Sequence, residues 1–119
     1  MDIGKKIWVF ADGDLPPQGN EEPYGHEALM ITNCTDETAN IRLSVLFSHR
    51  EPKENLLLTV PGKRVRCFRL DGPISQEGYQ IPFGQYALML ESDQPVVAVF
   101  GRLDRRKDVS YYSVAGYGV

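Results

Sequence analysis

Apolar and polar residues alternate along most of this chain, and this alternation limits the possible folds more than any other feature. Across residues 39–47, the apolar side chains occupy every second position, and Asn40, Arg42 and Ser44 lie between them. Successive side chains of a strand point to opposite faces, so the pattern is typical of a half-buried antiparallel β-strand. No stretch keeps a helical period long enough to predict a helix.

The same alternation, or a short apolar run, predicts seven further strands. They are residues 6–11, 27–32, 55–60, 63–70, 86–91, 96–103 and 111–117. Connectors 33–37, 61–62 and 92–95 carry turn residues and are short enough for hairpins, whereas connectors 12–25 and 71–84 are longer and rich in glycine and proline. Eight short strands joined mainly by tight turns predict an all-β fold, a single-domain antiparallel β-sandwich or barrel over residues 1–119.

The composition fits one soluble globular domain. The chain has 119 residues, of which 42% are hydrophobic and 24% are charged. The apolar stretch 7–11 is too short for an export signal, and no segment approaches the roughly 20 apolar residues that span a bilayer. We therefore expect a cytoplasmic protein.

The charge balance bears on the class of partner. A net charge of −3 argues against nucleic acid as the main partner, because binding its backbone normally requires a basic face. Basic residues still gather in two segments, Lys63, Arg64, Arg66 and Arg69 in one and Arg102, Arg105, Arg106 and Lys107 in the other. Each segment is either a binding surface or a solvated strand face.

Catalytic motifs are missing from the sequence. His26 and Glu27 pair a base with a carboxylate, but neighbours in a strand point to opposite faces and cannot share a proton or a metal ion. The serines lack the Gly-x-Ser-x-Gly context of a nucleophile, and no glycine-rich connector ends in Gly-Lys-Ser or Gly-Lys-Thr. We expect no enzymatic activity, no metal and no cofactor.

The two cysteines show no metal-ligand spacing. Cys34 lies in a turn-like segment and Cys67 in a strand-like one. Two reduced structural thiols are the interpretation that we favour, and the sequence leaves a disulfide between them open.

Arginine side chains are the strongest candidates for binding. Arg64 and Arg66 share one face of their strand, and with Arg102 they could converge on a carboxylate or phosphate group. The alternative is ordinary surface pairing of each arginine with a nearby carboxylate. The candidate residues for binding a ligand or partner are His26, Glu27, Arg64, Arg66, Arg102, Asp104 and Arg105.

A series of short motifs follows in order along nearly the whole chain. They are Trp8 with Ala11-Asp-Gly-Asp-Leu-Pro-Pro, His26-Glu27, Arg50-Glu-Pro, Leu58-Thr-Val-Pro, Lys63-Arg64, Ile81-Pro, Tyr86-Ala87, Ser92 with Pro95-Val-Val, Arg102-Leu-Asp-Arg105, Ser113 and Tyr117. In their order and spacing they resemble the sensory rhodopsin transducers, a family of small soluble bacterial proteins.

The resemblance implies a jelly-roll-like sandwich of two antiparallel sheets, assembled as a homotetramer. It also implies a non-enzymatic signalling role, as the soluble partner of a seven-helix retinal photoreceptor at the cytoplasmic membrane face. The family's fold resembles carbohydrate-binding modules, and DNA binding has been proposed for it. Two main hypotheses follow: a signalling protein that binds a membrane rhodopsin, and a module that binds a sugar-like or other small polar ligand. A DNA-binding regulator ranks third.

Overall fold

The computed structural model describes residues 3–106 and 108–119, and every regular element in these residues is a β-strand. The strands are β1 (Lys5–Leu15), β2 (His26–Asn33), β3 (Ala39–Leu46), β4 (Lys53–Val60), β5 (Arg64–Arg69), β6 (Gly84–Asp104), β7 (Ser110–Val114) and β8 (Tyr117–Gly118). All of their ladders are antiparallel. The expected all-β antiparallel fold class is thereby confirmed.

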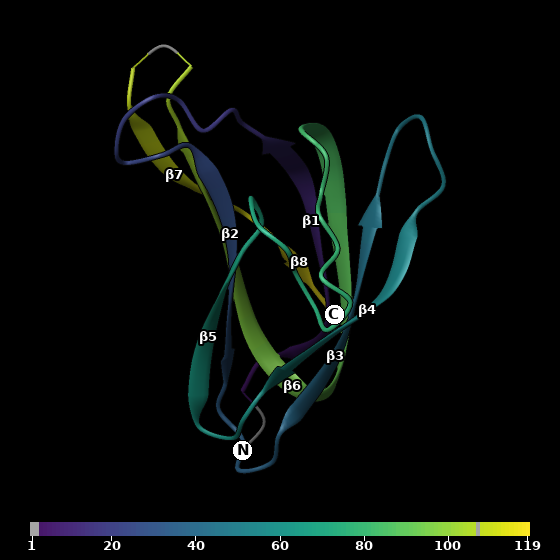
Figure 1. Cartoon of the computed structure of the whole chain (residues 1–119). Helices are drawn as coiled ribbons and strands as arrows, with labels where there is room; N and C mark the ends of the chain where they lie inside the picture. The colour runs from purple at the N-terminus through teal and green to yellow at the C-terminus, as the bar shows by residue number, and fades with distance from the viewer. Residues whose placement is uncertain (1–2, 107) are drawn as a thin grey trace.

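Two groups of strands face each other and are joined by the long strand β6 (Figure 1). The first sheet has the order β4-β3-β6-β1-β8. The second sheet consists of β5, β2, the last part of β6 and β7. Residues 84–92 and Val96 of β6 pair within the first sheet, and residues 97–104 pair within the second.

The predicted hairpin at residues 92–95 is wrong. The chain bends there and crosses from one sheet to the other, so the two halves of β6 pair with different strands (Figure 1). The backbone N–H of Gln94 donates to Ser92 Oγ at 3.3 Å, and Pro95 has no N–H for a ladder. The register with β1 is irregular at this bend, which is where strands commonly change direction.

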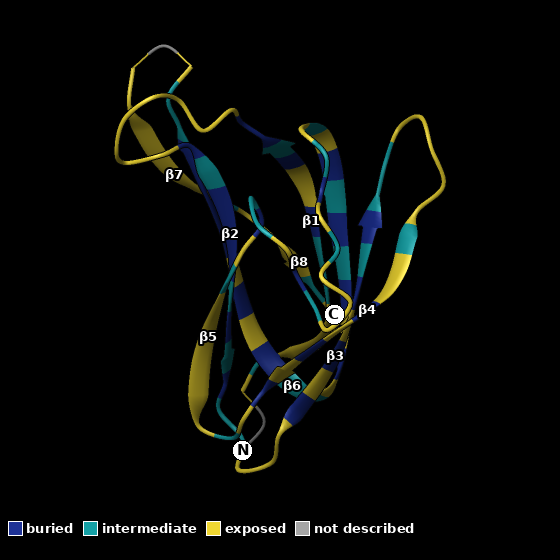
Figure 2. Cartoon of the chain, in the orientation of Figure 1, coloured by how far each residue is buried: buried dark blue, intermediate teal, exposed yellow. Residues whose placement is uncertain are grey.

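One hydrophobic core fills the space between the sheets (Figure 2). Every second residue of β6 is buried on both sides of the bend: Tyr86, Leu88, Leu90, Ser92, Val96, Ala98, Phe100 and Arg102. Near its middle, the Phe100 ring stacks on Phe10 with a centroid distance of 5.9 Å and lies 6.5 Å from the Tyr86 ring. The two sheets are therefore held by interdigitated side chains from both layers.

Connectors 33–37 and 61–62 also form no hairpin, because β2 does not pair with β3 and β4 does not pair with β5. They are arches between the sheets that pack against each other. The Asn33 amide donates to the carbonyl oxygens of Glu37 at 2.7 Å and Val60 at 3.0 Å. A Cβ on Gly62 would lie 2.3 Å from the carbonyl oxygen of Asp36, so this close approach requires glycine.

Two strand boundaries differ from the predicted ones. β1 continues through residues 13–15, which pair with residues 84–86 of β6, although this stretch was expected to belong to a loop. The predicted strand 111–117 is divided, because β7 pairs with β6 whereas β8 pairs with β1. Within residues 3–106 and 108–119, the structure has no helix capable of crossing a bilayer.

Candidate functional site

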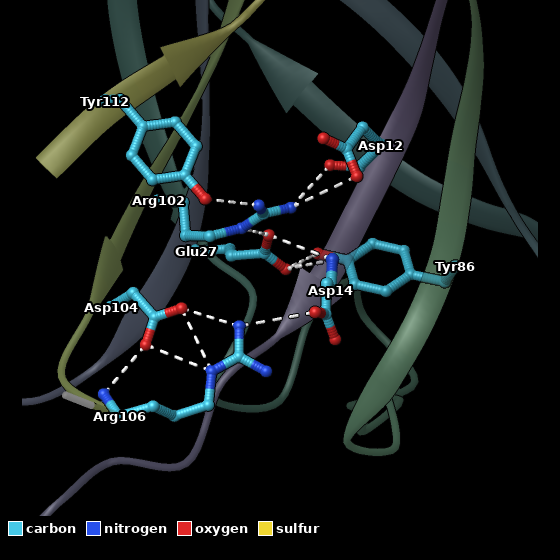
Figure 3. Close-up of polar contacts among 8 residues, drawn as sticks. All are labelled: Asp12, Asp14, Glu27, Tyr86, Arg102, Asp104, Arg106 and Tyr112. Atoms are coloured by element: carbon cyan, nitrogen blue, oxygen red, sulfur yellow. Dashed lines mark hydrogen bonds and ion pairs between the residues drawn. The ribbon is translucent and has the colours of Figure 1, made fainter. Parts of the chain in front are cut away.

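Glu27 is the centre of a buried polar cluster between the two sheets (Figure 3). Its carboxylate accepts hydrogen bonds from the Tyr86 hydroxyl at 2.7 Å and from Arg102 Nε at 2.6 Å. The backbone N–H of Asp14 donates to both carboxylate oxygens, at 3.2 and 3.1 Å. Three donors, one from β1 and one from each half of β6, therefore satisfy this buried charge, as burial of a carboxylate requires.

Arg102 joins Glu27 to the surface of the molecule. While Nε donates to Glu27, Nη2 donates to the carbonyl oxygen of Asp12 at 2.6 Å and Nη1 donates to the Tyr112 hydroxyl. The guanidinium group also lies over the Tyr112 ring, 5.3 Å from its centroid. Burial alone would lower the pKa of Arg102, but the hydrogen bonds to Glu27 and Tyr112 outweigh it and raise the pKa.

The strand register explains why these residues meet. Glu27 and Arg102 are directly paired between β2 and β6, and Arg102 is paired with Tyr112 on β7, so all three point to the inner face of the second sheet. Tyr86 lies on the opposite sheet, in the first half of β6. The cluster thus bridges the two sheets at the end of the sandwich where the hydrophobic core stops.

A second, partly exposed group of charges lies beside this cluster (Figure 3). Arg106 contacts Asp104 at 2.6 Å and Asp14 at 3.3 Å. Hydrogen bonds from the side chain and backbone of Arg106 hold the pKa of Asp104 below its usual value. Arg105 donates to the carbonyl oxygen of Pro23 at 2.9 Å and lies 3.8 Å from a carboxylate oxygen of Glu21. These contacts fasten the β6–β7 segment to β1 and to the β1–β2 loop.

Alkaline pH is expected to destabilise the protein through Tyr86. Burial, followed by the charge and hydrogen bond of Glu27, raises the pKa of Tyr86 above its ordinary value of 10.0. The unfolded phenol ionises near pH 10 whereas the folded one stays protonated. The stabilisation is therefore complete below about pH 10 and is lost above it, by up to about 1.4 kcal/mol per pH unit.

Urea denaturation at increasing pH, up to about pH 11, measures this loss in the wild type and in Tyr86→Phe. The variant lacks the buried hydroxyl, so its free energy of unfolding should fall less steeply above pH 10. Equal slopes for the two proteins would show that Tyr86 ionises normally in the folded state.

The expected convergence of Arg64 and Arg66 with Arg102 is wrong. Glu27 and Arg102 meet, but Arg64 and Arg66 pair with Asn33 and Ile31 at the other end of β2 and β5. Both arginines are exposed. His26 faces away from Glu27, and its Nδ1 lies 2.8 Å from the carbonyl oxygen of Tyr24.

His26 instead lines an open pocket of about 480 Å³ with Glu22, Pro23, Tyr24 and Arg69. The Arg69 guanidinium is already held by two hydrogen bonds to Asp71, at 2.9 and 2.8 Å. Of the second basic segment, Arg105 and Arg106 are paired as described above, and Lys107 lies outside the described residues. The two segments do not form one continuous basic site.

Sequence reasoning did not identify Asp12, Asp14, Tyr86 and Tyr112 as members of the cluster. Asp12 and Asp14 contribute backbone groups, which no residue pattern reveals. Tyr86 could have been identified from the alternation of inward and outward residues along β6, because this alternation directs Tyr86 and Arg102 toward the core.

The hydrogen-bonding groups of the cluster are already satisfied within the chain. All three guanidinium nitrogens of Arg102 have acceptors, and no buried side-chain nitrogen or oxygen in the described residues lacks a hydrogen-bond partner. No three His, Cys, Asp or Glu side chains in the part of the chain that the structure describes converge on a possible metal position. Cys34 and Cys67 are both free. The arrangement therefore holds strands together and presents Asp12 and Tyr112 at the surface.

Comparisons with known proteins agree over almost the full length of the chain. The family model described as Anabaena sensory rhodopsin transducer matches residues 3–118. The crystal structure of Thermotoga maritima 1070 is similar with a TM-score of 0.84 and 32% identity, covering 98% of this chain and 96% of that chain. The structure of the Anabaena sensory rhodopsin transducer is similar with a TM-score of 0.75 and 34% identity, covering 89% of this chain and 94% of that chain. No curated protein matches this sequence.

Proposed function

Because this chain belongs to the Anabaena sensory rhodopsin transducer family, we propose that it is a non-enzymatic signalling protein that binds the cytoplasmic face of a microbial sensory rhodopsin. The family match over residues 3–118 is the observation that carries the proposal. In this role the protein is cytoplasmic and soluble, and it relays the state of the photoreceptor to a further target.

Exposed glutamates at one end of the molecule support a contact with a membrane protein. Glu21 and Glu22 lie in the β1–β2 loop, Glu51 in the β3–β4 loop and Glu54 near the start of β4, and all four are exposed. Figure 1 shows these two loops at the same end of the sandwich, away from the β2–β3 turn. The cytoplasmic loops of membrane proteins are enriched in Lys and Arg, so their charge complements that of these four glutamates.

The test is a titration of the purified protein against its detergent-solubilised cognate rhodopsin and, separately, against duplex DNA over a series of salt concentrations. We expect saturable binding to the receptor. For DNA, each neutralised phosphate would contribute a slope of about −0.9 to the plot of log affinity against log salt. Tight, salt-steep DNA binding without receptor binding would contradict the proposal.

The proposed contact between the exposed glutamates and the basic loops of the rhodopsin can be tested by charge reversal. Glu51→Lys combined with Glu54→Lys should weaken receptor binding severalfold, and more strongly at low salt, because both side chains then repel basic loops. The matched control is Asp36→Lys with Glu37→Lys, the same change of charge at two exposed residues of the β2–β3 turn, at the opposite end. Equal weakening by the two variants, measured by the same titration, would show that only net charge matters.

The second candidate function is the binding of a small polar or sugar-like ligand in the open pocket beside His26. Tyr24 and Arg69 in this pocket offer the aromatic face and the hydrogen-bond donors that such ligands use. Saturation-transfer NMR with monosaccharides, in the wild type and in a Tyr24→Ala variant, tests this function. Binding that the variant retains unchanged would place the ligand elsewhere.

We also propose a homotetramer, assembled through the outer face of the second sheet. Exposed apolar side chains of neighbouring strands share this face: Val65, Val97, Val99 and Tyr111. Covering such a face removes apolar surface from water. Sedimentation equilibrium at micromolar concentration should give a mass of about four times the monomer mass, and a purely monomeric species would contradict this assembly.

A further inference from the structure

The β4 strand has an uncovered edge. In the described residues β4 pairs only with β3, on one side, and β5 pairs only with β2. Residues 56–60 of β4 carry no charge, and the Leu57 side chain is 50% exposed. Uncovered strand edges without charged residues are templates for the addition of another strand.

The orientation of the β4 backbone is shown by a side chain from β5. Arg66 Nη1 donates to the carbonyl oxygen of Thr59 at 2.8 Å, so this carbonyl points away from β3 and toward β5. In an antiparallel ladder, the N–H and C=O of one residue point to the same side, and alternate residues repeat that direction. The backbone groups of Leu57 therefore also point to the open side.

A groove follows this edge. β4 and β5 diverge from their connecting turn into different sheets (Figure 1), and a pocket of about 470 Å³ lies between them. Residues 57–59 form one wall, residues 66–69 form the other, and the segment 72–76 closes one end. Leu57 and Phe68 give the groove apolar surface beside its backbone edge.

The β5 wall is positively charged. Arg64 and Arg66 occupy the inward register of the second sheet but remain exposed, because the first sheet does not cover β5. Among the described residues, no carboxylate lies within ion-pair distance of Lys63, Arg64 or Arg66. The Arg66 guanidinium lies over the Phe68 ring, 4.9 Å from its centroid, with donors left for an acceptor.

We propose that this groove, between residues 57–59 of β4 and residues 64–69 of β5, binds an extended acidic segment of a partner protein. The segment adds to the edge of β4 as a new strand through the N–H and C=O of Leu57 and the N–H of Thr59, whose carbonyl oxygen already accepts from Arg66. Alternate side chains of an added strand face the same way, so its carboxylates meet Arg64 and Arg66 while the others contact the exposed Leu57. This contact is independent of the proposed contact with the rhodopsin, because the basic loops of the rhodopsin require an acidic surface.

A protein segment fits these observations better than nucleic acid does. A strand edge recognises backbone amides, which nucleic acids lack. Among residues 3–106 and 108–119, Phe68 is the only aromatic residue that lines the groove, and Arg66 covers its ring. The basic wall is also confined to one strand of an acidic chain.

The probe is a short peptide of alternating valine and glutamate, blocked at both ends and added to the isotopically labelled full chain. We expect saturable shifts of the backbone amides of Leu57 and Thr59 in NMR spectra. Two matched peptides separate the contribution of the carboxylates from that of the backbone hydrogen bonds. One has glutamine in place of glutamate, and the other is N-methylated at every second residue so that it cannot pair with a strand edge.

Arg66→Gln should weaken binding of the glutamate peptide roughly tenfold, because it removes one charge-assisted hydrogen bond. Arg50→Gln is the control, since Arg50 is exposed on the β3–β4 loop and packs on Phe47, away from the groove. Thermal unfolding of both variants verifies that they fold.

Several results would overturn the proposal. They are the absence of saturable binding, equal binding of the N-methylated peptide, equal losses in the two arginine variants, or shifts confined to other strands. A single-stranded oligonucleotide that displaced the peptide and bound more tightly would identify the groove as a nucleic-acid site instead.

Discussion

Replacing Arg102 with methionine is expected to lower the free energy of unfolding by about 3–5 kcal/mol. The substitution removes the hydrogen bond and the counter-charge that Glu27 receives at 2.6 Å, and it leaves a fully buried carboxylate without a cation. Urea denaturation followed by the fluorescence of Trp8, the single tryptophan of the chain, measures the change.

The matched control is Arg106→Met. Arg106 is also paired, but its side chain is 48% exposed, so its contacts should contribute at most about 1 kcal/mol. The double variant Glu27→Leu with Arg102→Met removes both charges and should recover much of the loss. Additive losses in the double variant, or a small loss for Arg102→Met alone, would contradict the assignment of a buried ion pair.

Phe100→Ala should cost about 3–5 kcal/mol of unfolding free energy. Phe100 is fully buried in the second half of β6, and its ring stacks on Phe10 from the other sheet. Truncation leaves a cavity at the contact between the sheets, where neighbouring side chains cannot easily move in. Chemical denaturation of the variant gives the value.

Val99→Ala is the neighbouring control for the monomeric chain, at concentrations below those at which the proposed tetramer forms, because Val99 then points outward and is 43% exposed. Its loss should be about 0.5–1 kcal/mol. Similar losses at positions 99 and 100 would contradict the strand parity on which the account of the core depends.

The strands were predictable from the sequence because inward and outward residues alternate. The same rule, applied further, would have corrected the error at residues 92–95. From Tyr86 through Ser92 to Arg102, every second residue of β6 except Gln94 is buried, as a continuous strand requires. Ser92 and Pro95 are typical turn residues, and they favour a hairpin where this parity favours a continuous strand. A bend between two sheets and a hairpin use the same residues, and only the pairing partners distinguish them.

The candidate site was harder to predict because it depends on which strands are neighbours. Glu27 and Arg102 were identified as charged residues of strands, yet their contact follows from the pairing of β2 with β6 across 75 positions of sequence. Arg64 and Arg66 have the same local pattern, but β5 pairs with the far end of β2. Local patterns report the face of a strand and not the position of its neighbours.

The most direct test of the proposed role compares the affinity for the cognate rhodopsin in the dark and under illumination, with the receptor in nanodiscs. A protein can relay the state of a receptor only if the two states bind it with different free energies. We expect the Kd to differ by roughly fivefold or more between the two conditions. Binding of equal affinity in the dark and in the light, or no binding in either, would contradict the account.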